Sequence, residues 1–472
     1  MRFVSLVIVA LLSVMGAQPA LADHDITVTF DDLDEIPDGA EEPPGPWDGF
    51  IDARDDEART TIVKGFVGEA ARVVIPALTH RGAGGILRMD PTPDEAWFRY
   101  YLRLDSWNAS SSGKLPGFAG LYSDSARGCI PSAEESPGWS ARTMYEATGT
   151  EGAQPGRVRL GTYLYHLGQA GTCGDQILWQ PGVVEQGRWY CVEGHVKMNT
   201  PGSADGLVEA WVDGAASLRW PDVELRRVGE ESIGVRHFWN NIYFGGSVVN
   251  SSDLTSTVDQ IAVSHGGRIW CVDPFVDDDE SPHQADLGEL YARSVLLGCG
   301  ERLACPDDQL TRGQMAALLA RALGLNRTSS PFSDTEGHFA ENDIGALAAA
   351  GITKGCTPTR FCPEDPVSRA EMAVFLDRAF GLDPGASAFD DVSGHWAEAS
   401  IVALAAAGIT KGCTPTSFCP DVAVSRGQVA TFLRRGFGFS LAPASVGFAD
   451  GRLGELAPGT FDDTAEPEVD LD

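Results

Sequence analysis

Five polar residues stand at spacings that suit proton-transfer chemistry on an anionic molecule. Lys114 lies in GKLPG, Ser140 and Arg142 lie in GWSAR, and Tyr163 and Tyr165 lie in TYLYH. Residues two apart on a strand share a face, so Ser140 points with Arg142, and Tyr163 points with Tyr165. If these faces line one concave sheet, two cations and two phenols converge. The cations would neutralise a carboxylate, and a phenol beside them would exchange protons.

The same residues also have a purely structural interpretation. Aromatic side chains are common on strands, so Tyr163 and Tyr165 taken alone predict only that aromatic rings cover one face of a sheet. Lys114 taken alone predicts a loop lysine. The sequence has no P-loop, dinucleotide-binding or zinc-protease motif, and we predict neither a metal nor a cofactor.

The elements that must position these residues are short strands. Residues 23–270 contain alternating runs such as EAWFRYYLRL, RWYCVEGHVKM and LVEAWVDG, and Asp213-Gly214 is a hairpin turn signal. Many short strands separated by turns predict one all-β sandwich of the jelly-roll type over residues 23–270.

Residues 97–264 resemble polysaccharide lyase family 14, the alginate and glucuronan lyases. The resemblance lies in GKLPG, GWSAR, the Tyr-x-Tyr strand and VKMNTPGSADGLVEAWVDG, in that order. It implies a polysaccharide lyase, a carbon–oxygen lyase that cleaves an anionic polysaccharide by β-elimination. GWSAR continues as TMYEATG, where the family tends to have Trp-Arg after the methionine, so the choice between alginate and glucuronan stays open. The implied catalytic residues are Lys114, Ser140, Arg142, Tyr163 and Tyr165.

The resemblance also implies a role for each of these residues. Arg142 would clamp the uronate carboxylate, with Lys114 as a second cation. Tyr165 would act as base and acid with Tyr163 assisting, or the two tyrosines would exchange these roles. Ser140 would bind substrate or orient Lys114.

The C-terminal part repeats with a fixed period. Cys299, Cys356 and Cys413 are 57 residues apart, and so are the arginines that follow Thr311, Ser368 and Ser425. A constant period of this length predicts supersecondary units that bury their apolar faces against their copies. Each copy shows two amphipathic helices, and a Ser or Thr N-cap opens the second.

These copies resemble the S-layer homology domain through F-x-D, the His-Trp-Ala run, GITKGC and the boxes TRGQ, SRAE and SRGQ. The resemblance implies repeats at residues 275–325, 332–382 and 389–440, each a helix-loop-helix unit, in an all-α pseudo-threefold bundle. Its grooves would bind a secondary cell-wall polymer of the peptidoglycan layer. The first copy lacks the Trp and has VLLGCG, so its groove departs most from the family. The implied groove residues, each of which has a structural ion pair as its alternative role, are Arg312, Arg369 and Arg426.

The N-terminus predicts export. Arg2 precedes an apolar stretch that ends at Met15, and Ala20-Leu21-Ala22 suits a cleavage site, so residues 1–22 are predicted to be a signal peptide. No later run is long and apolar enough for a membrane span, so we expect a secreted chain held at the cell surface, in the cell wall. Residues 441–472 are predicted to be an acidic, disordered tail.

Ten cysteines fit an oxidising location. The regular C-x5-C pairs predict three short disulfide loops, since a zinc site would need four clustered ligands. The other four cysteines allow three pairings, and we favour the first with the second and the third with the fourth. The predicted disulfides are Cys299–Cys305, Cys356–Cys362, Cys413–Cys419, Cys129–Cys173 and Cys191–Cys271.

The charge of the chain excludes one class of partner. The formal net charge is -32 with only five lysines, so nucleic acid is not an expected partner. The acidic run Asp277–Glu280 lacks the residue order of a calcium-binding loop and is interpreted as the start of a linker.

The sequence thus predicts a cell-wall-anchored, S-layer-associated polysaccharide lyase. Two alternatives are a non-catalytic carbohydrate-binding protein and a structural S-layer-type surface protein.

Overall fold

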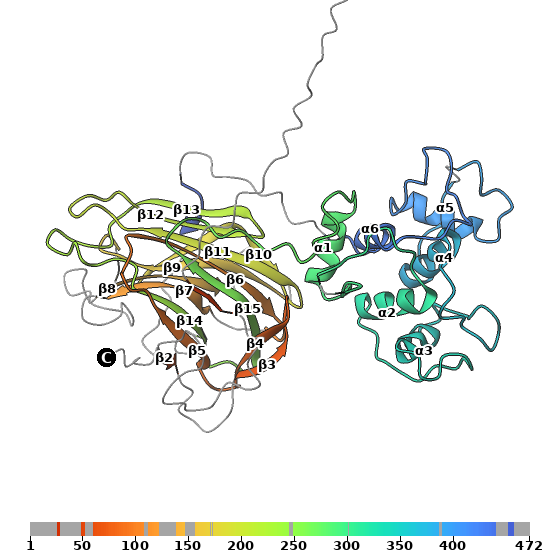
Figure 1. The fold of residues 1–472 in the computed structure, drawn as a ribbon, viewed down its shortest axis with the longest axis horizontal. Helices are drawn as coiled ribbons and strands as arrows, with labels where there is room; N and C mark the ends of the chain where they lie inside the picture. The colour runs from red at the N-terminus through yellow and green to blue at the C-terminus, as the bar shows by residue number, and fades with distance from the viewer. Residues whose placement is uncertain are drawn as a thin grey trace, which may run out of the picture.

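The computed structural model describes residues 26–28, 49–51, 60–107, 112–121, 138–146, 156–169, 171, 173–244, 249–300, 302–386, 389–439 and 452–456. These residues form a β-sandwich followed by a helical part (Figure 1). The predicted signal peptide and Cys129 lie outside the described residues. No described helix has the length and apolar character needed to cross a membrane.

The sandwich consists of two antiparallel sheets of eight strands each. The first sheet runs in the order β13 (Ala215–Val223), β12 (Gly206–Val212), β11 (Trp189–Lys197), β6 (Glu95–Leu104), β15 (Leu254–Ser264), β4 (Glu69–Ile75) and β3 (Thr60–Lys64), and β1 (Ile26–Val28) also pairs with β15. The second runs in the order β16 (Glu455–Leu456), β10 (Asp175–Glu185), β9 (Arg157–Tyr165), β8 (Gly138–Glu146), β7 (Gly113–Leu121), β14 (His237–Phe244), β5 (Arg81–Arg88) and β2 (Gly49–Ile51). The predicted all-β sandwich is confirmed, and its jelly-roll type stays a prediction.

Alternation along the strands builds the core between the two sheets. In β6, every second side chain from Ala96 to Leu104 is buried in the core cluster. The Phe98 ring lies 5.0 Å from that of Phe118 in β7 and 5.4 Å from that of Phe238 in β14, measured between centroids. Residues next to these in β7, β8, β9 and β14 therefore point away from the core.

Part of the predicted disordered tail is ordered, which corrects that prediction. β16 pairs with β10, and Leu453 forms an isolated antiparallel bridge with Arg219. The Arg452 guanidinium lies 3.9 Å from the Trp220 ring centroid, a cation–π contact. The short segment 452–456 is ordered because it pairs with the edge of a sheet. The acidic composition of the residues around it gave no sign of this pairing.

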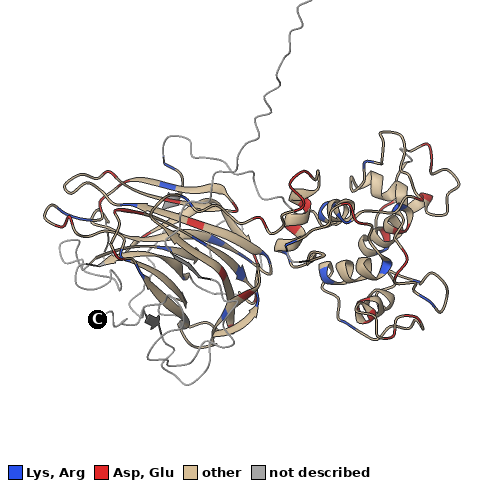
Figure 2. Cartoon of the chain, viewed as in Figure 1, with Lys and Arg blue, Asp and Glu red and all other residues tan. Residues whose placement is uncertain are grey.

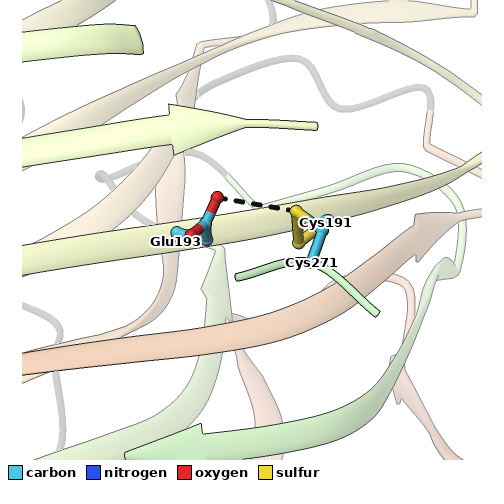
Figure 3. Close-up of side chains that lie close together, drawn as sticks. All are labelled: Cys191, Glu193 and Cys271. Carbon is cyan, nitrogen blue, oxygen red and sulfur yellow. Dashed lines mark hydrogen bonds between the residues drawn. A yellow bond between two sulfur atoms is a disulfide. The ribbon is translucent and has the colours of Figure 1, made fainter. Parts of the chain in front are cut away.

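The described disulfides match the predicted pairs. Cys191–Cys271 ties β11 to the segment after β15, and the three short loops are closed by Cys299–Cys305, Cys356–Cys362 and Cys413–Cys419. Cys173 is also disulfide-bonded, and its predicted partner lies outside the described residues. Figure 3 shows the Glu193 carboxylate beside the Cys191–Cys271 bond. Because both sulfurs are in the disulfide and Glu193 pairs with Arg268 at 2.8 Å, this cluster is not a metal site.

The described residues of the helical part form six helices: α1 (Gln284–Ala292), α2 (Arg312–Ala322), α3 (Glu341–Ala349), α4 (Arg369–Phe380), α5 (Glu398–Ala406) and α6 (Arg426–Phe437). Ser368 caps α4 in a capping box with Glu371, as the SRAE motif predicts. Backbone bonds link the segments before α2, α4 and α6 in a closed ring: Leu310 N–H donates to Val424 O, Val424 N–H to Val367 O, and Val367 N–H to Leu310 O.

The first helix of this part packs on the sandwich as well as on α6 (Figure 1). Arg188, in the turn before β11, donates to the Glu289 carboxylate from Nε and Nη2, the latter at 2.8 Å, and pairs with Asp213 at 2.6 Å. The side chains of Arg188 and Glu289 are 6% and 1% exposed. The Tyr291 hydroxyl donates to the Phe66 carbonyl. The helical part is therefore joined to the sandwich by a buried ion-pair network.

Removing the Glu289 carboxylate should destabilise the chain strongly. Glu289→Ala leaves Arg188 buried with one carboxylate fewer, and breaking a buried ion pair costs about 3–5 kcal/mol. We expect a loss of about that size in the free energy of unfolding, measured by denaturant titration. Arg157→Ala is the control, because the Arg157–Glu185 pair is 43% and 28% exposed and should contribute about 0–1 kcal/mol. Equal losses in both variants would contradict a buried joint.

Candidate functional site

The five predicted catalytic residues meet on the face of the second sheet that points away from the core. Antiparallel partners on neighbouring strands place their side chains on the same face. Ser140 in β8 pairs with Tyr165 in β9, and Arg142 in β8 pairs with Tyr163 in β9. The two predicted pairs of side chains therefore form adjacent rows across two strands.

Lys114 joins these rows from β7. It pairs with Met144, the next outward residue of β8 after Arg142. The register of β7 shifts between Lys114 and Gly117 against both of its neighbours, and Pro116 lies in this irregularity. The Lys114 Nζ lies 4.7 Å from the ring centroid of Tyr163 and 5.7 Å from that of Tyr165.

The two tyrosine rings contact each other edge to face. Their centroids are 5.3 Å apart and their planes are inclined by 70°. Met144 belongs to the same small buried cluster as the two tyrosines. The ammonium group of Lys114 thus lies near both tyrosine rings.

Arg142 is fixed by two groups of β14. Its Nη2 donates to the Asn241 carbonyl at 2.8 Å, and its guanidinium carbon lies 5.5 Å from the Trp239 ring centroid. Gly117 lies between Arg142 and Trp239 in the same row of the sheet. A Cβ at Gly117 would meet the Arg142 backbone at 2.5 Å, so this position accepts only glycine.

All five predicted residues are buried, with side chains no more than 1% exposed. Buried polar groups of this kind are costly unless they have partners, and their concentration on one face is typical of a functional site.

Three further residues share these rows and were not predicted as part of the site. Trp239 and Gln176 extend the row of Arg142 and Tyr163, and His237 extends the row of Ser140 and Tyr165 through Ala119. Burial, with help from two nearby arginines, lowers the pKa of His237 to about 3, so its ring is neutral at pH 7. The two-residue alternation in HFWNNIYF predicts that His237 and Trp239 share one face of their strand. It does not predict that Trp239 lies beside Arg142, because that depends on which strands pair.

A second candidate site is a pocket of about 370 Å³ in the helical part. Its lining includes the cationic side chains of Arg369, Lys411 and Arg435, together with His283, and none of its described lining residues is acidic. Arg369 donates from Nε to the Phe418 carbonyl at 2.7 Å, while its Nη2 has no hydrogen-bond partner among the described residues. Burial lowers the pKa of Arg369. The pocket therefore suits an anionic ligand.

The three predicted groove arginines differ in their neighbours. Each donates from Nε to a backbone carbonyl of the next segment in cyclic order: Arg312 to Phe361, Arg369 to Phe418, and Arg426 to Ala304. Among the described residues only Arg312 of the three adds a salt bridge, to Glu371 at 2.5 Å. Asp391 acts electrostatically on Arg369 without forming a salt bridge. Asp308 and Asp277 act in the same way on Arg426. At the positions equivalent to Glu371, the other two copies have the neutral residues Gln428 and Gln314. The structure thus brings each arginine to a repeat boundary, and within the described residues it pairs only Arg312 with a carboxylate in a salt bridge.

The comparisons with known proteins identify part of the helical region. The family model of the S-layer homology domain matches residues 331–373 and 388–430. These ranges fall on the second and third predicted repeats. The chain therefore carries S-layer homology domains, and the predicted cell-surface location is confirmed at that level.

Two curated relatives are similar to parts of the chain. One is an uncharacterised cell wall amidase of Bacillus anthracis, 34% identical over 30% of this chain and 28% of its own length. The other is an S-layer protein of Bacillus licheniformis, 28% identical over 31% of this chain and 18% of its own length. The chain thus spans less than a third of the length of these relatives.

Two solved structures are similar in fold to part of the chain. The alginate lyase Aly36B is 22% identical, with a TM-score of 0.38, over 44% of this chain and 83% of that chain. The marine PL-14 alginate lyase from Aplysia kurodai is 19% identical, with a TM-score of 0.36, over 43% of this chain and 86% of that chain.

Proposed function

We propose that this chain is a polysaccharide lyase displayed at the bacterial cell surface. The display is proposed because residues 331–373 and 388–430 are S-layer homology domains. Its β-sandwich, of the jelly-roll type, cleaves a polyuronate, alginate or glucuronan, by β-elimination. Its helical part, a pseudo-threefold bundle of three repeats, holds the enzyme on a secondary cell-wall polymer. The proposed domain bounds are those expected from the sequence, except that residues 452–456 belong to the sandwich.

One observation carries the catalytic proposal: Lys114, Ser140, Arg142, Tyr163 and Tyr165 come from three strands and share adjacent rows of one sheet face. Other proteins use such faces for binding alone, but the combination of two cations with two contacting phenols suits proton abstraction beside a carboxylate. The resemblance of GKLPG, GWSAR and TYLYH to polysaccharide lyase family 14 points to the same chemistry.

The reaction distributes its steps among these residues. Arg142, held by Asn241 and Trp239, clamps the uronate carboxylate, and Lys114 adds a second positive charge. Tyr165 as phenolate takes the C5 proton, a double bond forms between C4 and C5, and the C4–O bond breaks. The departing oxygen receives a proton from Tyr165, with Tyr163 assisting. Atoms and charge balance without a metal ion or a redox partner.

The anchoring proposal rests on the charge of the repeat boundaries. The closed ring of backbone bonds at Leu310, Val367 and Val424 supports a pseudo-threefold arrangement of the three repeats. The pocket that includes Arg369 and Lys411 concentrates positive charge in a chain of net charge -32. An anionic wall polymer is a ligand of matching chemistry.

A panel of polyuronates tests the catalytic proposal directly. Elimination creates a C4–C5 double bond that absorbs ultraviolet light, so the absorbance of alginate or glucuronan solutions should rise on addition of the full chain. Binding to a polyuronate without any absorbing product would favour the carbohydrate-binding alternative. The absence of both an absorbing product and polyuronate binding would favour a structural S-layer-type protein.

A further inference from the structure

Three aspartates converge in the segment that joins the sandwich to the helical part. Asp273, Asp278 and Asp279 each offer a carboxylate oxygen, and these oxygens all lie within 4.8 Å of one another. The segment follows the disulfide-bonded Cys271 and ends at α1. In Figure 2 acidic residues gather on α1 and on the chain just before it.

Asp278 is the unusual member of this cluster, because it is buried without a partner. It is 1% exposed, and neither of its carboxylate oxygens has a hydrogen-bond partner among the described residues. Burial, together with the charges of Asp273, Asp277 and Asp279, raises the pKa of Asp278 to about 6. A carboxylate in this position is costly unless a positive ligand compensates it.

The other two repeats show that the fold itself does not require a carboxylate there. The positions equivalent to Asp278, 57 and 114 residues further on, are Thr335 and Val392. Both are buried, at 1% and 0% exposed, and Thr335 satisfies its hydroxyl by donating to the Phe332 carbonyl. A neutral side chain therefore fits this site, and the acidic one in the first repeat needs another explanation.

The polar contacts of the cluster are also specific to the first repeat. Gln284 stands where the other repeats have Glu341 and Glu398, whose carboxylates accept the N–H of a glycine. The Gln284 amide instead donates to Asp273 at 3.1 Å and to Asp279 at 3.2 Å. These two bonds hold two of the three carboxylates in one place.

No side-chain cation forms a salt bridge with the cluster within the described part of the chain, and only Arg302 lies close enough to act on Asp273 electrostatically. Arg302 comes nearest in role, but its Nη2 donates to the backbone carbonyl of Asp273 at 2.8 Å. No salt bridge of 4.0 Å or less is formed by the carboxylates of Asp273, Asp278 or Asp279 among the described residues. Three negative groups thus lie within 4.8 Å of one another, and a bound cation would offset their mutual repulsion.

We propose that Asp273, Asp278 and Asp279 bind a calcium ion at the joint between the sandwich and α1. The available ligands are all oxygen, which selects a hard cation. Calcium accepts six to eight oxygen ligands in flexible geometry, so three carboxylates with backbone carbonyls or water suffice. Magnesium demands near-ideal octahedral geometry, which an irregular segment supplies less readily. The ion would fasten the segment after Cys271 to the start of α1.

Calcium titration of the full chain, after removal of metal with a chelator, tests this site by calorimetry and thermal unfolding. The matched variant is Asp278→Val, which installs the residue of the third repeat. We expect the wild type to bind one more calcium ion per chain than Asp278→Val, with a dissociation constant on the order of 10⁻⁴ to 10⁻³ M. Calcium should raise the Tm of the wild type and not that of the variant.

Two controls keep folding and surface charge separate from the site. Without calcium, Asp278→Val should unfold at the same temperature as the wild type or a higher one, because it removes a buried charge. Glu336→Gln, at the exposed position equivalent to Asp279 in the second repeat, should bind calcium as the wild type does. Equal calcium uptake by the wild type and Asp278→Val, no uptake by the wild type at millimolar calcium, or a larger Tm rise with magnesium would each overturn the assignment. None of these measurements depends on lyase activity.

Discussion

Tyr165→Phe should abolish polyuronate cleavage while leaving the fold intact. The substitution removes one oxygen, and with it the group that we propose exchanges protons with C5 and the leaving oxygen. General acid–base catalysis contributes about 10²–10⁴-fold to rate. We therefore expect kcat to fall by at least about 100-fold with KM little changed, because Arg142 and Lys114 still bind the carboxylate. Formation of the absorbing product measures this.

The control for this prediction is a tyrosine on the other face of the same sheet. Tyr145 in β8 belongs to the core cluster, and its hydroxyl donates only a long bond of 3.4 Å to the Tyr243 carbonyl. Tyr145→Phe should therefore retain most of the activity. Tyr163→Phe should reduce the rate less than Tyr165→Phe does, because Tyr163 only assists. Wild-type rates in both Tyr163→Phe and Tyr165→Phe would show that the proposed mechanism is wrong.

The sequence predicts which residues of one strand share a face, because that follows from the two-residue period. It does not predict which strands become neighbours. Ser140 and Arg142 point together from their spacing alone, but their pairing with Tyr165 and Tyr163 depends on the register of β8 and β9. Trp239 reaches Arg142 because β14 lies beside β7, a pairing between segments more than 100 residues apart. Non-local register of this kind is set by the whole core.

The helical part is more predictable because its signals are local. Ser368 with Glu371 marks the start of α4, and the structure shows that capping box. The sandwich–helix joint lacked such a signal. Glu289 looks like an ordinary helical carboxylate, and its burial against Arg188 arises only from tertiary packing. Asp273 likewise joins the acidic run after it only in three dimensions, so the residue order alone did not indicate a cation site.

Arg369→Ala should detach the chain from purified cell walls more than Arg312→Ala does. Both substitutions remove a bond to a backbone carbonyl of the next repeat, so the structural loss is shared. They differ in their ion pairs: Glu371 already forms a salt bridge with Arg312, whereas Arg369 forms none among the described residues and lines a pocket with Lys411 whose described lining has no carboxylate. Losing one charge-assisted bond to an anionic ligand costs about 1.5–3 kcal/mol, which is about a 10- to 150-fold weaker affinity.

Co-sedimentation with walls over a range of protein concentrations measures this difference. Arg360→Ala, which removes an exposed charge of the second repeat, should bind as the wild type does. The Tm of each variant shows whether lost binding reflects lost folding. Arg426→Ala should resemble Arg369→Ala, because the residue that corresponds to Glu371 is Gln314 at that boundary. If Arg312→Ala weakened binding as much as Arg369→Ala at equal Tm, internal neutralisation would not distinguish the repeat boundaries. The three arginines would then act only as structural bonds between repeats.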